Sequence, residues 1–235
     1  MNNQSKLLTA LTSQVGRKLL TGITGVLLVL YVIAHLTGNL SLLSSDPHAF
    51  NKYGAFLHSF GTLFYLIEIG LALVILAHAY IGISIAIRKR KARKQGYQVY
   101  NSKGGPSKQS LSSRTMIITG TVLLLFIVIH VAQFRFGPGV ADGYGIVVDG
   151  KVMHDLRRIT FETFAQPGWV VFYVGVMLLL GFHLRHGIWS MLQSLGAMRP
   201  SYSPLIYGLA LILGILLAIG FLLLPIWIHF NGATL

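Results

Sequence analysis

The amino-acid sequence predicts an all-α membrane protein, and three observations carry that prediction. Hydrophobic residues fill 54% of the 235 positions, charged residues only 11%, and the mean hydropathy is +0.67, which is unusual for a soluble domain. Apolar stretches long enough to cross a bilayer occur five times. Lysine and arginine gather at one set of ends of these stretches. The net charge of +13 therefore fits a membrane topology, and nucleic acid is not expected as a partner.

Each apolar stretch can cover about 30 Å of hydrocarbon at about 1.5 Å per residue. The predicted spans are residues 19–43, 61–87, 115–134, 168–192 and 205–229. Glycine, serine and threonine recur within them, as is typical where helices or a flat cofactor approach the backbone closely. We therefore expect one transmembrane domain, residues 1–235, in which five helices form a bundle.

The charges predict how the chain is oriented. One set of span ends carries fourteen basic and no acidic residues: Lys6, Arg17, Lys18, nine positions from Arg88 through Arg114, Arg185 and Arg199. The opposite side carries five basic and five acidic residues. Because cytoplasmic loops are rich in Lys and Arg, we expect the N-terminus inside and the C-terminus outside. In the outer connection between the third and fourth spans, Val152 to Phe164 is predicted to be a short amphipathic helix at the interface.

Four of the nine histidines lie within predicted spans, each on a different helix: His35, His78, His130 and His183. Counted from the inner ends at about 1.5 Å per residue, His35 and His130 share a depth in the outer half, and the other two share a depth in the inner half. Two facing imidazoles at each depth are what two bis-histidine haems require. The chain has no cysteine, which excludes covalent haem attachment and thiolate metal sites.

Several neighbouring residues are candidates for further contacts. His186 lies one turn from His183 and is the alternative axial ligand, but it is nearer the inner headgroups, where a propionate contact is the better interpretation. Arg17 and Arg185 are further candidates for propionates, which need cations or strong donors; Lys18, Arg114 and the outer Arg135 belong to the same group. Glycines near the ligands are expected to leave room for a macrocycle: Gly38, Gly82 and Gly187.

Glu68 is the only acidic residue inside a predicted span, and it lies in the outer half near the level of His35 and His130. Two interpretations stay open for it. A carboxylate at this depth could accept a proton from a quinol, or it could hydrogen-bond a neighbouring helix.

At these residues the chain resembles the cytochrome b subunit of succinate:quinone oxidoreductases, in the form with a single five-helix, diheme anchor. The resemblance covers nearly the whole sequence. It is carried by Gly16-Arg17-Lys18 with Thr21-Gly22, by His35-Leu36-Thr37-Gly38-Asn39, by Phe50-Asn51-Lys52-Tyr53, and by Gly181-Phe182-His183-Leu184-Arg185-His186-Gly187 with Ser190 and Gln193. It implies that His35 and His130 bind the distal haem b, and that His78 and His183 bind the proximal one.

The resemblance also implies a function. The chain would be the non-catalytic anchor of a succinate dehydrogenase or fumarate reductase, an enzyme of the tricarboxylic acid cycle or its reverse reaction. It would pass electrons between an iron-sulfur subunit and a membrane quinone, for which we favour menaquinone over ubiquinone. A flavoprotein subunit and the iron-sulfur subunit would dock on the cytoplasmic face of a bacterial inner membrane, and lipids would surround the spans. No dicarboxylate chemistry is expected on this chain, which lacks a G-x-G-x-x-G fingerprint.

Two other functions compete with this one. The first is a diheme anchor of a different oxidoreductase, such as a hydrogenase or formate dehydrogenase. The second is a haem-free transporter or proton channel, although transporters usually show internal repeats or interrupted helices, and neither is visible in the sequence.

Overall fold

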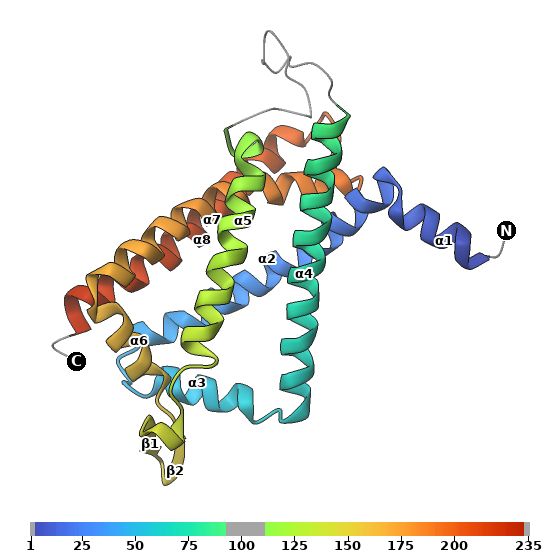
Figure 1. Cartoon of the computed structure of the whole chain (residues 1–235). Helices are drawn as coiled ribbons and strands as arrows, with labels where there is room; N and C mark the ends of the chain where they lie inside the picture. Colours follow the sequence, from blue (N-terminus) through green and yellow to red (C-terminus); the bar gives the residue numbers. More distant parts are fainter. Residues whose placement is uncertain (1–2, 93–110, 233–235) are drawn as a thin grey trace. The chain divides into compact units, whose positions relative to one another are not determined.

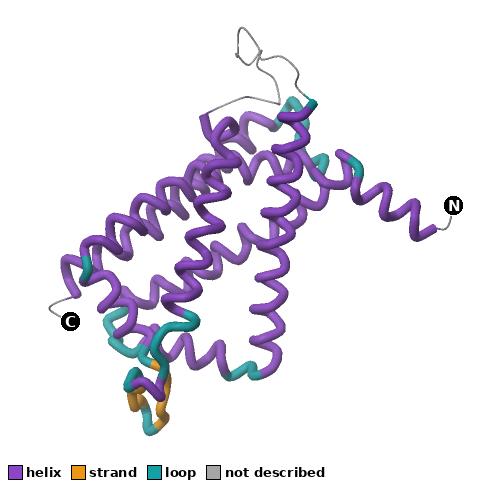
Figure 2. The backbone as a smooth tube through the Cα atoms, viewed as in Figure 1, coloured by secondary structure: helices purple, strands orange, loops and turns teal. Residues whose placement is uncertain are grey.

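The computed structural model describes residues 3–92 and 111–232, and helices make up most of this part of the chain (Figures 1 and 2). Five helices are long and apolar enough to cross a membrane, which confirms the predicted number of spans. They are α2 (Gln14–Asn39, extended by a 3-10 turn over Leu40–Leu43), α4 (Thr62–Lys91), α5 (Leu111–Phe134), α7 (Pro167–Ser194) and α8 (Ser203–Asn231). A short helix, α1 (Asn3–Thr12), precedes them. Residues 93–110, within the predicted basic loop, lie outside the described residues.

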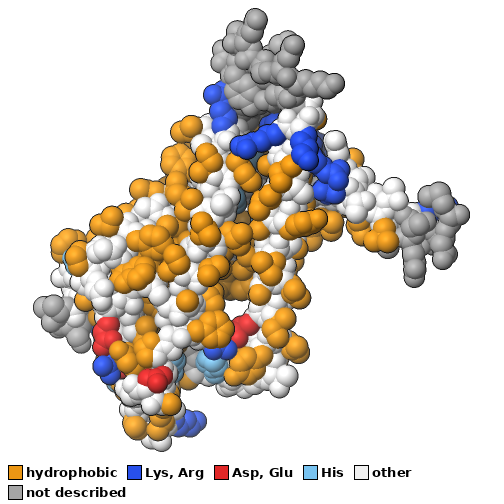
Figure 3. Space-filling model, viewed as in Figure 1, with side chains coloured by type: hydrophobic (Ala, Val, Ile, Leu, Met, Phe, Trp, Pro, Cys, Tyr) orange, Lys and Arg blue, Asp and Glu red, His pale blue; other side chains and the backbone are white. Residues whose placement is uncertain are grey.

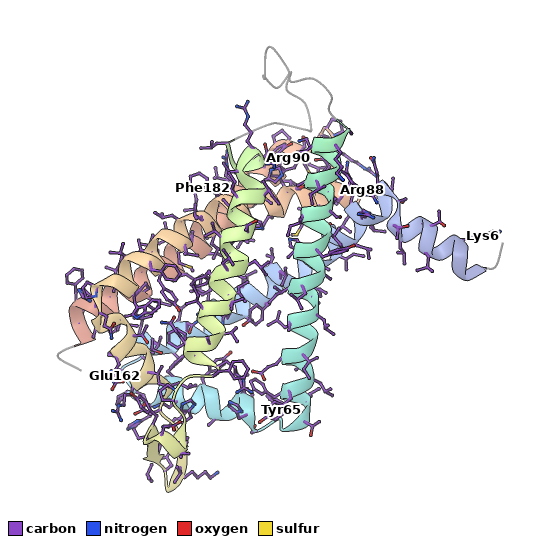
Figure 4. All side chains as sticks on the ribbon, in the orientation of Figure 1. Lys6, Tyr65, Arg88, Arg90, Glu162 and Phe182 are labelled. Carbon is purple, nitrogen blue, oxygen red and sulfur yellow. The ribbon has the colours of Figure 1, made fainter. Side chains whose placement is uncertain are left out.

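The sequence of these helices explains both their form and their surroundings. In hydrocarbon every backbone polar group needs an internal partner, and a helix supplies one along its own length. Hydrophobic side chains accordingly cover much of the face shown in Figure 3. Leu73, Leu125 and Leu216 are examples of exposed apolar side chains, each with about 60% of its surface exposed. Helix α4 ends in a basic run, Arg88–Lys91, and these cations are stabilised by the negative C-terminal end of the helix dipole. Arg88 and Arg90 mark that end in Figure 4.

The chain divides into two compact units, and each of the five long helices contributes to both. Unit 1 comprises residues 1–30, 71–121 and 181–215, and unit 2 comprises residues 31–70, 122–180 and 216–235. All six acidic residues belong to unit 2, whereas fourteen of the nineteen basic residues belong to unit 1. The charge asymmetry of the sequence therefore follows the division into units. The single domain expected from the sequence stays a prediction.

Unit 2 has an aromatic core. The Tyr173 ring on α7 contacts the rings of Phe126 and Phe164 with centroids 5.1 and 5.0 Å apart. The buried members of this core are Leu42, Phe126, Phe164, Tyr173, Val176, Met177 and Ile228. At another contact Gly220 of α8 lets Leu36 of α2 approach closely, since a Cβ there would lie 2.6 Å from the leucine side chain. Such packing fixes the part of α2 that carries His35.

Short elements in unit 2 connect the long helices. They are α3 (Ala49–His58), a 3-10 turn over Val140–Asp142, the strands β1 (Gly145–Val148) and β2 (Lys151–His154), and α6 (Leu156–Ala165). The strands form one antiparallel hairpin in which Val147 pairs with Val152. The predicted helix over Val152 to Phe164 is therefore wrong in its first residues. Helix α6 begins only after Asp155, whose carboxylate accepts from the Arg158 backbone N–H and caps the helix.

Candidate functional site

The four histidines predicted as ligands meet in two pairs, and each pair lies within one unit. In unit 2 the rings of His35 and His130 have centroids 5.8 Å apart and planes nearly perpendicular, at 87°. In unit 1 His78 and His183 lie close enough to interact electrostatically. The combinations are those expected from depth along the helices, whereas their role as haem ligands stays a prediction.

In the inner pair, each imidazole faces a threonine hydroxyl. Thr24 Oγ1 lies 3.0 Å from His78 Nδ1, and Thr119 Oγ1 lies 3.1 Å from His183 Nδ1. Thr24 directs its own proton to the Leu20 carbonyl oxygen at 2.8 Å, and Thr119 directs its proton to carbonyl oxygens of its own helix. Each hydroxyl oxygen is thus left to accept a hydrogen bond from an Nδ1–H. With the proton placed on Nδ1 in this way, the Nε2 lone pair of both rings would be available to a metal.

The outer pair is held by aromatic and amide side chains. The Tyr173 hydroxyl donates to Gln133 Oε1 at 2.6 Å, so its oxygen can accept a long hydrogen bond from His130 Nδ1 at 3.4 Å. The His35 ring stacks between Tyr31, with centroids 5.5 Å apart, and Phe221, with centroids 5.8 Å apart. With its proton on Nδ1, His130 would present Nε2 as the inner histidines would, and stacking restrains the ring of His35.

The number of ligands at each site limits the metal centre that could bind. Among the described residues, no group of three or more His, Asp or Glu side chains is placed to hold a metal ion. A bare ion such as zinc needs three or four protein ligands. Haem iron needs only two, because the macrocycle supplies the other four. Two imidazoles at each site match the number of protein ligands that a haem needs, and haem binding stays a prediction.

Glycines near the histidines differ in what surrounds them. A Cβ at Gly120 would lie 3.2 Å from His183 Cε1, so this glycine lets the ring lie against α5. Open space surrounds Gly82 and Gly187, as expected from the sequence. At Gly38 the expectation of open space is wrong, because the ring of Tyr53 packs directly onto its backbone.

His186 and the basic candidates for propionate contacts on the inner side all belong to unit 1. The Nδ1 atom of His186 is buried and has no hydrogen-bond partner among the described residues. Its ring meets Trp189 edge-on with centroids 4.8 Å apart, and the charges of Lys89 and Arg185 lie near it. Arg17 instead donates to Ser84 Oγ on α4 at 2.8 Å. Buried polar atoms usually have a hydrogen-bond partner, so His186 Nδ1 is a candidate to bind a polar group of a ligand.

Glu68, the carboxylate predicted in the outer half, is paired with Arg135. Arg135 Nε lies 2.7 Å from Oε1 and Nη2 lies 3.0 Å from Oε2, so the ion pair is bidentate. Glu68 also interacts electrostatically with Tyr31, the residue stacked on His35. The structure therefore brings Glu68 into the surroundings of the outer histidine pair.

The sequence pattern did not single out the residues that support the imidazoles: Thr24, Thr119, Tyr173 and Gln133. A threonine within a membrane helix usually bonds back to its own backbone, and both threonines do so here. Their second contact joins residues 54 and 64 positions apart in the chain. Each of the two threonines directly precedes a glycine, and this shared pattern is the one signal in the sequence that could have suggested them.

Comparison of the chain with models of protein families, with curated proteins and with solved structures finds no match.

Proposed function

We propose that the chain is the diheme membrane anchor of a succinate:quinone oxidoreductase, passing electrons between an iron-sulfur subunit and a membrane quinone. The observation that carries this proposal is the hydrogen bonding of the inner histidines. Thr24 and Thr119 each engage an Nδ1 atom and leave Nε2 free, which is the arrangement that orients imidazoles as metal ligands.

The residues present fit two haems. Because a bond between a metal and an imidazole nitrogen is about 2 Å long, one iron between two imidazoles would hold their centroids about 6 Å apart, close to the 5.8 Å between His35 and His130. None of the residues of α4, which carries His78, is buried. The orphaned Nδ1 of His186 suits a propionate.

Each residue then has a defined task. His35 and His130 would hold the outer haem, and His78 and His183 the inner one. Haem b, when bound, accepts and releases one electron at its iron. Thr24 and Thr119 orient the inner rings, and the Tyr173–Gln133 hydrogen bond does the same at the outer pair. His186 and Arg185 supply a donor and a cation for propionates, and Arg17 offers a second cation in unit 1.

Glu68 is proposed to exchange protons with the quinone. Its carboxylate is the only acid in a membrane-spanning helix among the described residues, and it keeps 32% of its side-chain surface exposed. A quinone arriving from the bilayer could reach it. We favour menaquinone over ubiquinone as the substrate.

Partners and location follow from the charges. The basic side of the chain is proposed to face the cytoplasm, where the flavoprotein and iron-sulfur subunits would dock. The basic residues of unit 1 would serve both as a topology signal and as contacts for lipid headgroups. The proposed location is a bacterial inner membrane, with the C-terminus outside.

Purification of the complex through a tag on this chain tests the function. We expect a flavoprotein and an iron-sulfur protein to co-purify, and a reduced-minus-oxidised spectrum with haem quantification to give two b haems per chain. Co-purification of a hydrogenase or formate dehydrogenase would favour the rival anchor. A colourless protein without partners would favour the transporter.

A further inference from the structure

Outside the histidine pairs, the most specific polar contact in unit 2 is the ion pair between Glu68 on α4 and Arg135, the residue after the end of α5. The guanidinium donates through two nitrogens, at 2.7 and 3.0 Å. Fork-shaped pairing of this kind fixes the plane of a carboxylate as well as its position. The side chains of Arg135 and Glu68 keep 38% and 32% of their surface exposed, so a small molecule can reach the pair.

The ion pair is connected to the outer histidines. Tyr31 interacts electrostatically with Glu68, and its ring stacks on His35 at 5.5 Å with only 14° between the planes. The Arg135 guanidinium carbon also lies 5.9 Å from the centre of the Tyr65 ring. A group bound at the ion pair would therefore lie beside the Tyr65 ring and near Tyr31, whose ring stacks on His35.

A shallow, open apolar depression on the surface of α5 lies near the same arginine. Its lining residues are Ile127, Val128, Val131, Ala132 and Phe136. The Phe136 ring is 5.6 Å from the Arg135 guanidinium carbon. A molecule with a long apolar tail and a polar ring, as a membrane quinone has, matches an apolar depression that lies near a charged pair.

We propose that Arg135 is a positioning residue for Glu68 at the quinone site, an inference that rests on the proposed function. A carboxylate has about four acceptor positions, and bidentate pairing with Arg135 occupies two of them. The others are held toward the substrate. In quinol oxidation one O–H bond of the quinol breaks as an O–H bond to Glu68 forms. Glu68 then releases this proton to water and takes up the second quinol proton in the same way. The two electrons would leave one at a time toward the haem that His35 and His130 would hold, and quinone is the product. Quinone reduction runs the same proton transfer in reverse.

A double-mutant cycle on the purified complex in proteoliposomes tests this role. Turnover is measured with a short-chain menaquinone analogue, and separately with a dye that accepts electrons directly from the partner subunits. We expect Glu68→Gln to lower quinone-linked kcat about a hundredfold and Arg135→Gln to lower it about tenfold, with little change in KM. In the Glu68→Gln background, Arg135→Gln should have no further effect. Arg135→Lys should restore part of the loss.

The matched control is Arg158→Gln, which breaks another 2.7 Å arginine–glutamate pair of unit 2, with Glu162. It should leave quinone turnover unchanged, and all variants should keep dye-linked turnover and the haem spectrum. Equal effects of Arg135→Gln with and without Glu68 would overturn the inference, as would an Arg135→Gln variant with normal quinone turnover. A complex that lacks haem or partner subunits would overturn the proposed function itself, so the two failures can be told apart.

Discussion

At the scale of single residues, a threonine hydroxyl lies within hydrogen-bonding distance of Nδ1 of each inner histidine. When Thr24 and Thr119 donate to carbonyls of their own helices, each hydroxyl accepts from an Nδ1–H of the neighbouring ring. The same arrangement occurs twice, on α2 facing α4 and on α5 facing α7. This repetition on two helix pairs supports the proposed ligand role of both rings.

This arrangement predicts the effect of removing either hydroxyl. Thr24→Val and Thr119→Val keep the shape of the side chain but remove the acceptor, so the imidazole loses its fixed tautomer and orientation. We expect retention of the inner haem to weaken about tenfold or more, with a shift in its redox potential. Redox-titrated spectra of the purified complex measure both effects. Thr121→Val is the control, because that hydroxyl donates to the Ile117 carbonyl of its own helix. An equal effect of the control variant would contradict the prediction.

At the scale of elements, one buried amide ties α3 to α6. Asn51, with 1% of its surface exposed, donates to Asp155 Oδ1 at 2.9 Å and accepts from the Arg157 backbone N–H at 2.9 Å. Asn51 therefore holds the capping residue and the first turn of α6 at once. The segment Phe50-Asn51-Lys52-Tyr53 carries part of the resemblance in sequence, and the structure gives its asparagine a structural task.

Replacing the Asn51 amide should destabilise the packing of α3 on α6. Asn51→Ala leaves a buried backbone N–H and a carboxylate without their partner, at a cost of about 1–3 kcal/mol. We expect a lower thermal midpoint and faster proteolysis between residues 145 and 165. The neighbouring variant Lys52→Ala removes only exposed ion pairs with Asp46 and Asp149 and should change stability little. Equal stability of the two variants would argue against this role for Asn51.

A second contact of α6 should depend on pH. The Tyr144 hydroxyl donates to Glu162 at 2.7 Å, and this bond together with the Arg158 guanidinium holds the pKa of the Glu162 carboxyl below its usual range (Figure 4 labels Glu162). Because the folded-state pKa is the lower one, this stabilisation is present above the ordinary glutamate pKa and is lost as pH falls through the folded value. Below about pH 4 the protection factors of residues 145–162, which correct hydrogen exchange for the pH dependence of the intrinsic amide rate, should therefore fall. In Glu162→Gln the protection factors should be low at neutral pH and change less on acidification.

The elements also show what the sequence could and could not predict. The spans were predictable because a run of about 20 apolar residues is typical of a helix that crosses a bilayer. The hairpin was missed because Lys151 to His154 is only four residues long, and its partner strand is set by pairing, not by local pattern. Helix α3 was missed for a similar reason: it is only ten residues long, and its attachment to α6 depends on Asn51, a contact between residues far apart in the chain. The histidine pairs could be predicted from the depth of each histidine along its helix. The contacts of Thr24 and Thr119 with these rings could not, because they depend on the rotation of each helix about its own axis.

At the scale of the whole molecule, charge predicts the topology. Fourteen basic residues and no acidic one belong to unit 1. A reporter inserted between Lys91 and Lys108, mostly outside the described residues, should therefore be cytoplasmic. A reporter in the turn at Asp149-Gly150 of the hairpin should be on the outer side. Finding the first reporter outside would overturn the orientation and the proposed docking face together.

The pairing of the four histidines makes the sharpest prediction for the molecule as a whole. Loss of one axial ligand leaves an iron one bond short, so only the haem served by that histidine should be lost or change its spin state. Because each pair lies within one unit, alanine variants of His35 and His130 should damage the same outer haem. Alanine variants of His78 and His183 should damage the same inner haem and block electron entry from the iron-sulfur subunit.

His186→Ala is the matched control for this series, because His186 lies one turn from His183 but its ring packs on Trp189. It should keep both low-spin haems and shift at most the potential of the inner one, since a propionate contact tunes an iron without binding it. The measurement is a redox-titrated spectrum for each variant, with the low-spin signals counted. The assignment would be wrong if His35→Ala and His78→Ala removed the same haem, or if His186→Ala removed a haem that His183→Ala left in place.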